Sequence, residues 1–418
     1  MKTHFKKLLF AGLIVTFFGC ETEDNLPLNE QGEQVQVEAK NESLDRYLDF
    51  AQLKGKKTVP FQDGYLIDGD IFVSQEVLKN LGNISPDVSP KSGIGKENLQ
   101  YRLNTLVTTS PGVTRTITYR VQSSVPSSGA GSDWRTALTA AFAEWNNVRN
   151  INLNFQPTSG TANINITAYS QVSGIIASAS LPSNGNPGNS IQINLHHNNL
   201  DLDWKVQTLA HEIGHSIGLH HTDYNTPGAN PYNIPGTIIP GTWNSDPNSI
   251  MNHQITKGWT GFPYLDQLSI RTLYPQDASE KPLYAYLKSS TGGYNWTPNW
   301  STYGFGAQGF SYWGYIGYVF TSPKSGTVPL YKYRHNITHV DYLSLDPNLG
   351  ALYPGNVNQG EIARVYTSGN SERTPVYEWY HPNKGFYFTT LTNDGVVSSG
   401  GWTGGGIAFY TIKLDQYN

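Results

Sequence analysis

The sequence has a single cysteine, Cys20, and only two methionines, the initiator and Met251. One thiol cannot form an internal disulfide, so a disulfide-stabilised fold is excluded. Charged residues make up only 14% of the chain, the formal net charge is −4, and no run of basic residues occurs. Because nucleic-acid binding relies on clustered basic side chains, a nucleic acid is not expected as a partner.

The chain also has no apolar run long enough to cross a bilayer as a helix. Its longest, residues 8–18, follows a lysine-containing start, which is typical of a secretory signal over residues 1–20. The end of this segment is similar to the lipobox of bacterial lipoproteins and implies a lipid anchor at Cys20. Cleavage without lipidation is the alternative, because Phe17 and Phe18 fit that motif poorly. We expect an exported protein, either a lipoprotein of the bacterial outer membrane or cell surface or a secreted protein.

Length and charge distribution divide the chain into parts. At 418 residues it is too long for a single hydrophobic core. Residues 21–108 are rich in charge and are interpreted as a propeptide and linker, with a Gly/Pro/Ser-rich stretch before residue 100 that suits cleavage. A central domain is predicted over residues 109–278, and an aromatic-rich domain over residues 279–418.

A metal-binding pattern, HExxHxxGxxH, begins at His211. It reads His-Glu-Ile-Gly-His-Ser-Ile-Gly-Leu-His-His. On a helix, His211 and His215 are four residues apart, so both imidazoles point toward the same place, and Glu212 can reach a water held there. Gly218 permits a left-handed helix end that brings His221 back as a third ligand. Three neutral imidazoles leave one position open for water, as in a single catalytic rather than a structural Zn²⁺.

The alternative to a zinc site is an amphipathic core helix with surface histidines. Apolar residues also recur at helical spacing from Val206 to Ile217. This stripe fits both interpretations, because a metal-binding helix also packs an apolar face against the core. His220 falls outside the motif spacing and is interpreted as a bystander. His196 and His197, after the last strand expected before the motif, form either a polar loop or a second metal site.

The motif resembles that of the metzincin metallopeptidases, which share the extended zinc pattern followed by a tight turn with a methionine beneath the metal. With Ser-Ile-Met-Asn downstream, the chain is similar to the dual-action HEIGH metallopeptidases over residues 112–277. This resemblance implies zinc ligands His211, His215 and His221, the base Glu212, and a Met-turn at Met251. Several metzincins carry a tyrosine two residues after this methionine. Here that position is His253, which is either an oxyanion donor or weak fifth ligand, or a plain loop histidine.

The predicted fold class is α+β, with a metzincin-like domain built from a twisted mixed sheet, the zinc helix and the Met-turn. Residues 116–121, 151–155, 164–166 and 191–195 alternate as strands. Asp133 is expected to cap a helix that begins at Trp134 and buries an apolar face, and a last helix is expected over residues 264–273.

The C-terminal domain repeats. Pro282-Leu283-Tyr284, Pro329-Leu330-Tyr331 and Pro375-Val376-Tyr377 begin three similar aromatic units. A period of roughly 46 residues predicts three all-β units closed by symmetry, with a trefoil-like arrangement as our guess and a short propeller as the alternative. Most of the aromatic residues are expected to be core, and the others can form platforms for a glycan or protein ligand.

These patterns favour a secreted or surface-anchored zinc metalloendopeptidase that acts on protein or peptide substrates. It would hydrolyse peptide bonds through a zinc-activated water, with Glu212 as general base. The substrate is expected to add antiparallel to an edge strand near residues 174–181. The alternative is a surface binding lipoprotein that acts through its C-terminal repeats on a polysaccharide or protein target, although such a protein has no need of Glu212. Zinc hydrolysis of a non-protein amide is a third interpretation.

The charged leader predicts a zymogen. No thiol lies downstream of the signal, so a cysteine switch is excluded, and a carboxylate of the leader is a candidate to occupy the open zinc position. Asp63, Asp68 and Asp70 cluster in the leader, and Asp70 is favoured because the adjacent glycine permits close approach. The plainer interpretation is that these are turn carboxylates between strands.

Overall fold

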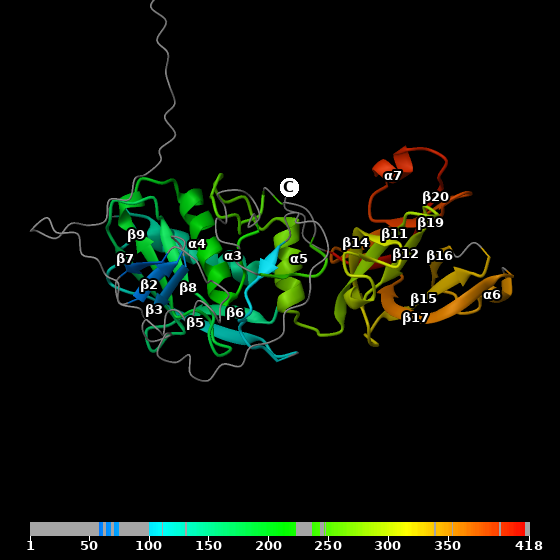
Figure 1. The fold of residues 1–418 in the computed structure, drawn as a ribbon. Coiled ribbons are helices and arrows are strands. Elements are labelled where there is room, and N and C mark those ends of the chain that lie inside the picture. The colour runs from blue at the N-terminus through cyan, green and yellow to red at the C-terminus, as the bar shows by residue number, and fades with distance from the viewer. Residues whose placement is uncertain are drawn as a thin grey trace, which may run out of the picture. The chain divides into compact units, whose positions relative to one another are not determined.

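The computed structural model describes residues 58–61, 64–67 and 71–74 and most of residues 100–413. Within the last stretch the residues left undescribed are 111, 130, 131, 223–235, 243–245, 247, 338, 339, 353 and 393. The described residues form two regions (Figure 1). We call residues 58–274 the mixed-sheet domain and residues 280–412 the repeat domain.

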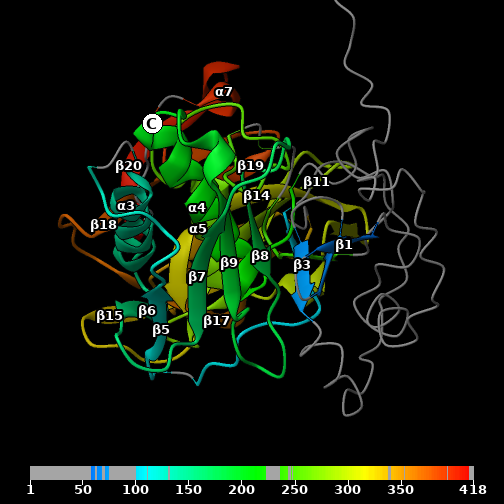
Figure 2. The ribbon, with the colours of Figure 1, turned by 90° about the vertical axis from the view of Figure 1, so that its left-hand side faces the viewer.

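The mixed-sheet domain is built around an eight-stranded sheet in the order β1-β2-β3-β8-β9-β7-β5-β6. Figure 2 shows the strands side by side from β6 to β3. Strands β5, β6, β7 and β9 run parallel, β8 is antiparallel to β9, and β3 is parallel to β8. The sheet strands are β1 (Thr58–Phe61), β2 (Gly64–Ile67), β3 (Ile71–Ser74), β5 (Arg115–Val121), β6 (Leu153–Pro157), β7 (Ile164–Tyr169), β8 (Ala177–Ser180) and β9 (Ser190–Asn194).

Helices pack on this sheet and supply part of its core. α3 packs on α4 and β6, and α4 packs on β8 and β9. The strand β8 is the short sequence Ala-Ser-Ala-Ser, whose small side chains are all buried, so that α4 can approach the sheet closely. The remaining elements are α3 (Trp134–Asn147), α4 (Leu202–Ile217), α5 (Tyr264–Leu273), the 3₁₀ turn η2 (Leu195–His197) and the two-stranded pair β4 (Tyr101–Arg102) and β10 (Thr237–Ile238).

The predicted α+β class is confirmed, and the last helix spans the expected residues.

One local prediction was wrong: Asp133 precedes α3, but its side chain makes no capping hydrogen bond. Its carboxylate instead pairs with the ammonium group of Lys205 on α4. Because Lys205 is 2% exposed, the carboxylate compensates a buried charge there, which outweighs a cap.

The repeat domain contains three units of three strands each, in which the first strand pairs with both the second and the third. The third strands also meet one another, at Tyr318↔Ile412, Phe320↔Arg364 and Tyr366↔Tyr410. The strands are β11 (Glu280–Lys288), β12 (Tyr294–Thr297) and β14 (Phe310–Phe320), then β15 (Thr327–His335), β16 (Asp341–Ser344) and β17 (Asn356–Tyr366), then β18 (Arg373–His381), β19 (Gly385–Thr389) and β20 (Thr403–Ile412).

Short elements interrupt these strands, namely η3 (Trp300–Thr302), β13 (Gly306–Ala307), α6 (Leu349–Leu352) and α7 (Gly395–Ser398). The region is therefore predominantly rather than entirely β. The threefold repetition expected from the sequence is present, and the trefoil-like arrangement stays a prediction. In the described part of the chain, no helix combines the length and apolarity needed to span a membrane.

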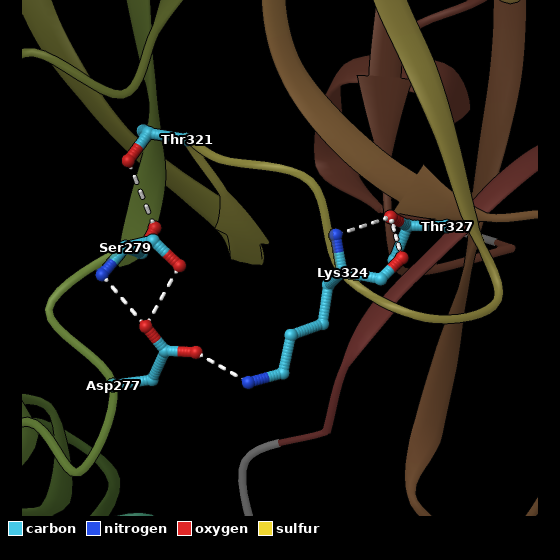
Figure 3. A network of polar contacts seen from close by, with 5 residues as sticks. All are labelled: Asp277, Ser279, Thr321, Lys324 and Thr327. Atoms are coloured by element: carbon cyan, nitrogen blue, oxygen red, sulfur yellow. Dashed lines mark hydrogen bonds and ion pairs between the residues drawn. The ribbon is translucent and has the colours of Figure 1, made fainter. Parts of the chain in front are cut away.

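A polar network lies where the chain passes from α5 to β11 (Figure 3). Asp277 accepts hydrogen bonds from the amide and hydroxyl of Ser279 and pairs with Lys324 at 2.6 Å. The carbonyl of Ser279 accepts from the amide and hydroxyl of Thr321, and Thr327 donates to the carbonyl of Lys324. These bonds tie the start of the first repeat to the loop that follows it.

The first repeat also packs on α5. Leu268 and Tyr318 are the buried centre of an apolar cluster, and the rings of Tyr264 and Tyr315 stack with centroids 5.3 Å apart. Arg271 lies over the Tyr318 ring and pairs with the buried carboxylate of Glu280. Residues Ser43–Asn418 accordingly cluster as one compact unit, with α5 shared by both domains.

Candidate metal centre

Helix α4 places His211 and His215 on one face, and both side chains are buried. The Nδ1 atom of His211 lies 2.7 Å from the carbonyl oxygen of Ile250, and Nδ1 of His215 lies 3.0 Å from that of Leu219. A carbonyl oxygen accepts, so each Nδ1 carries the proton and each Nε2 keeps its lone pair. This is the tautomer that a metal ligand needs.

The helix ends at Gly218, which has φ 112° and donates its amide to the carbonyls of Gly214 and His215. A side chain there would lie 2.6 Å from Leu106 and 2.8 Å from the Thr105 carbonyl, so packing as well as conformation requires glycine. The predicted left-handed helix end is confirmed, and it returns the chain toward α4.

The return brings His221 to the other two histidines. One ring nitrogen from each of His211, His215 and His221 lies within 4.8 Å of the others, and all three residues are buried. A tetrahedral zinc with bonds of about 2.0–2.1 Å places two imidazole nitrogens roughly 3.3 Å apart. The Nε2 atoms of His215 and His221 are 3.1 Å apart, so the donor set fits such an ion.

Glu212 follows His211 on α4 and is 3% exposed. Tyr169, at the end of β7, lies within electrostatic range of the Glu212 carboxylate. Burial, reinforced by that charge, raises the pKa of Tyr169 to about 12. Tyr169 therefore stays protonated at neutral pH. Nothing in the motif spacing indicated this tyrosine, because it reaches the site only through the sheet.

The other histidines fall into different groups. The ring of His253 lies 6.3 Å from that of His221, so His253 borders the metal centre. His220 is buried, and its Nδ1 accepts the amide hydrogen of His221, so it shapes the returning chain. His197 contacts the Ser173 carbonyl at 2.9 Å. Among the described residues, the cluster of His211, His215 and His221 is the one group with metal-ligand geometry.

The turn at residues 249–252 contacts all three histidine segments. The Ile250 carbonyl meets His211, and the Met251 carbonyl accepts the amide of Thr222, next to His221. The Met251 sulfur would lie 2.6 Å from a Cβ built on Gly214, next to His215. Met251 thus packs against α4 at Gly214, where a larger residue would collide with its sulfur.

Asp266 on α5 holds this turn, and sequence reasoning missed it. It is 1% exposed and accepts hydrogen bonds from Ser249 Oγ at 2.7 Å, the Ile250 amide at 2.7 Å and Gln100 Nε2 at 2.6 Å. Burial raises the pKa of Asp266 to about 7, although the bonds from Ser249, Ile250 and Gln100 oppose that rise. An acidic residue early in a helix is ordinarily interpreted as a partner of the helix dipole, which hides its role.

Strand β8 was the expected edge for a substrate. In the described chain its outer side is occupied, because β3 pairs with it in parallel register, with Ile71 opposite Ala179 and Phe72 opposite Ser180. The edge is therefore covered by a segment that precedes the metal centre by more than a hundred residues. Cys20, Asp63, Asp68 and Asp70, the other residues of interest in the leader, lie outside the described residues.

Comparison with known proteins gives two family matches. The model described as a dual-action HEIGH metallo-peptidase matches residues 66–274, beginning inside β2, and a domain of unknown function, DUF5648, matches residues 348–412. No curated protein matches the chain. Two similar solved structures are "Structure of Myroilysin" and "Crystal structure of myroilysin", both 18% identical with TM-scores of 0.29. The aligned regions cover 41% and 40% of this chain, and 83% and 86% of the two myroilysin chains.

Proposed function

The chain belongs to the dual-action HEIGH metallopeptidase family, and we propose that it is a zinc metalloendopeptidase with Glu212 as its general base. One observation carries the proposal. Three buried imidazoles converge within 4.8 Å, and the Glu212 carboxylate is held beside them on the same helix. Buried imidazoles that face one another at this distance are suited to share a cation, and the adjacent carboxylate supplies the base that a structural metal site lacks.

His211, His215 and His221 would hold the zinc, which when bound supplies Lewis acidity to the attacking water and the scissile carbonyl. Glu212 takes a proton from that water and returns it to the leaving amine. Tyr169, which is protonated at neutral pH, offers a hydrogen bond beside Glu212. His253, whose ring lies 6.3 Å from that of His221, would donate a hydrogen bond to the developing oxyanion.

The pairing of β3 with β8 supports a latent precursor. A substrate that adds antiparallel to β8 needs the edge that β3 covers in the parallel direction. Cleavage between β3 and residue 100 would leave β3 attached only by strand pairing, so that it can dissociate and free the edge. Limited proteolysis of the full chain, followed by a peptide assay, tests this latency. Activity that does not increase when this linker is cut would contradict it.

Export and anchoring belong to the same proposal. A protease that acts outside the cell fits the signal-like start and Cys20, which would carry a lipid anchor. The repeat domain would hold a glycan or protein target near the enzyme through exposed aromatic rings such as Trp313 and Tyr380, which are 37% and 44% exposed. Loss of membrane association in a Cys20→Ser chain would support the anchor, and unchanged association would contradict it.

A casein or gelatin digest of the proteolytically processed chain tests the enzyme directly. We expect fragments of the substrate, no cleavage after treatment with a zinc chelator, and recovery when zinc is restored. Glu212→Gln is the matched variant, because it preserves size and the three imidazoles while removing the base. Digestion that continues in chelator, or in Glu212→Gln, would contradict the proposed function. A chain that binds zinc but cleaves no peptide would instead favour the binding-protein alternative.

A further inference from the structure

Ile250 joins two partners through the two ends of its own backbone. Its amide donates to Oδ2 of Asp266 at 2.7 Å, and its carbonyl accepts from Nδ1 of His211 at 2.7 Å. One residue has little freedom when both its amide and its carbonyl are bonded. The orientation of His211 therefore depends on where the Asp266 carboxylate lies.

Asp266 is suited to this work in its ionised form, because a carboxylate only accepts hydrogen bonds. Its Oδ1 takes bonds from Ser249 and Gln100 while its Oδ2 takes the Ile250 amide, so both oxygens face donors. An asparagine in either orientation would turn an NH₂ group toward at least one of these donors. The carboxylate is therefore needed as an acceptor on both sides.

Asp266 satisfies three buried donors, a role that any structural anchor of the turn would share. The contacts it fixes are also directed at one place, because the turn reaches the His211 ring, the amide beyond His221 and the glycine beside His215. Such contacts orient ligands, as second-layer carboxylates do at metal sites.

We propose that Asp266 is a positioning residue of the metal centre, which fixes the 249–252 turn so that the Ile250 carbonyl orients His211. The inference rests on the proposed zinc site and deepens it. Metal affinity would then depend on a residue of α5, outside the histidine motif on α4.

The test measures zinc affinity of the full chain by competition with a chromophoric chelator, together with the visible spectrum of the cobalt(II)-substituted chain. Asp266→Asn is expected to weaken zinc binding by about tenfold to a hundredfold and to alter the cobalt spectrum. Glu280→Gln is the matched control, because Glu280 is a buried carboxylate that pairs with Arg271 of α5. Glu280→Gln is expected to lower the melting temperature while leaving both metal readouts unchanged.

Ser249→Ala keeps the test decisive if Asp266→Asn does not fold. It removes the hydroxyl that donates to Asp266 and accepts the Met251 amide, and it should weaken zinc binding less than Asp266→Asn. The natural chain is expected to bind zinc tightly. If Ser249→Ala and any folded Asp266→Asn bind zinc equally tightly, the inference about Asp266 is overturned while the proposed function stands. A natural chain that binds no zinc would overturn the proposed function, and this inference with it.

Discussion

The core of the mixed-sheet domain consists mainly of aliphatic side chains around a few rings, whereas the core of the repeat domain includes many tyrosine, tryptophan and phenylalanine rings. The two domains also differ in what their buried polar clusters contain. In the repeat domain, buried Asp341 is matched by Arg334 and Asn295. In the mixed-sheet domain, buried His211, His215 and His221 face one another instead. Charge matched within the chain, as also between Lys205 and Asp133, indicates a structural role, whereas neutral imidazoles directed at one another indicate a bound cation.

The proposed function locates the chemistry in the mixed-sheet domain, and replacing Glu212 tests this most strongly. Glu212→Gln should keep the zinc but lower peptide turnover by roughly a hundredfold to ten-thousandfold, because the base is lost while the imidazoles remain. Glu361→Gln, on the repeat domain, is the control and should leave turnover unchanged. Turnover and bound zinc are measured on the same preparations. A Glu212→Gln chain that cleaves at the natural rate would place the chemistry elsewhere.

The cores of the two domains meet at α5, and their contact there can be tested. Leu268 is fully buried against Tyr318, so Leu268→Ala should lower the free energy of unfolding by about 2–5 kcal/mol. Leu330→Ala, inside the repeat core, is the control of equal burial. Calorimetry should show one transition for the natural chain and two for Leu268→Ala, because the domains would no longer unfold together. Two separate transitions in the natural chain would contradict the shared role of α5.

A smaller effect is expected at the border of the metal centre. His253→Ala should retain zinc, since three other imidazoles hold it, but lose about tenfold or more in turnover with the substrate KM little changed. His197→Ala is the control, as a histidine that contacts a backbone carbonyl away from the cluster. Steady-state kinetics separate the two effects. An unchanged turnover number in His253→Ala would make it a plain loop histidine.

The smallest effect concerns the junction network of Figure 3, where Lys324 lowers the pKa of Asp277 to about 2. A carboxylate with a lowered pKa in the folded state stabilises the fold above its unfolded pKa of 3.8, and this contribution is lost as pH falls toward 2. Both side chains are partly exposed, so the loss should be less than roughly 1 kcal/mol. Asp277→Asn should flatten the dependence of stability on pH over this range. Equal slopes for the two chains would contradict the assignment.

Local patterns in the sequence predict the part of the site that depends on local geometry. The spacing of His211 and His215 and the glycine at 218 determine where the imidazoles lie, and the structure brings them together as expected. Asp266 could not be found this way, because its role comes from α5 packing against a turn that precedes it. The pairing of β3 with β8 likewise joins segments distant in sequence, which periodicity within each strand cannot reveal.

Competition between local and tertiary interactions explains the remaining difference. Asp133 stands where a helix cap is expected, yet the buried ammonium of Lys205 takes its carboxylate. A charge brought into the interior by α4 must be compensated, and that requirement appears only after the helices have packed. In the repeat domain, the period of the aromatic motifs predicts three units, but the pairing of the third strands depends on closure of all three.

The central claim is that the three histidines hold one catalytic zinc, and zinc content measured together with activity tests it most directly. Purified, processed chain is dialysed and analysed by inductively coupled plasma mass spectrometry, then assayed on a peptide before and after removal of metal. The account predicts about one zinc per chain, near-complete loss of both zinc and cleavage in His215→Ala, and recovery of the stripped natural chain on adding zinc. A natural chain that contains no zinc and still cleaves peptide in the presence of chelator would contradict it.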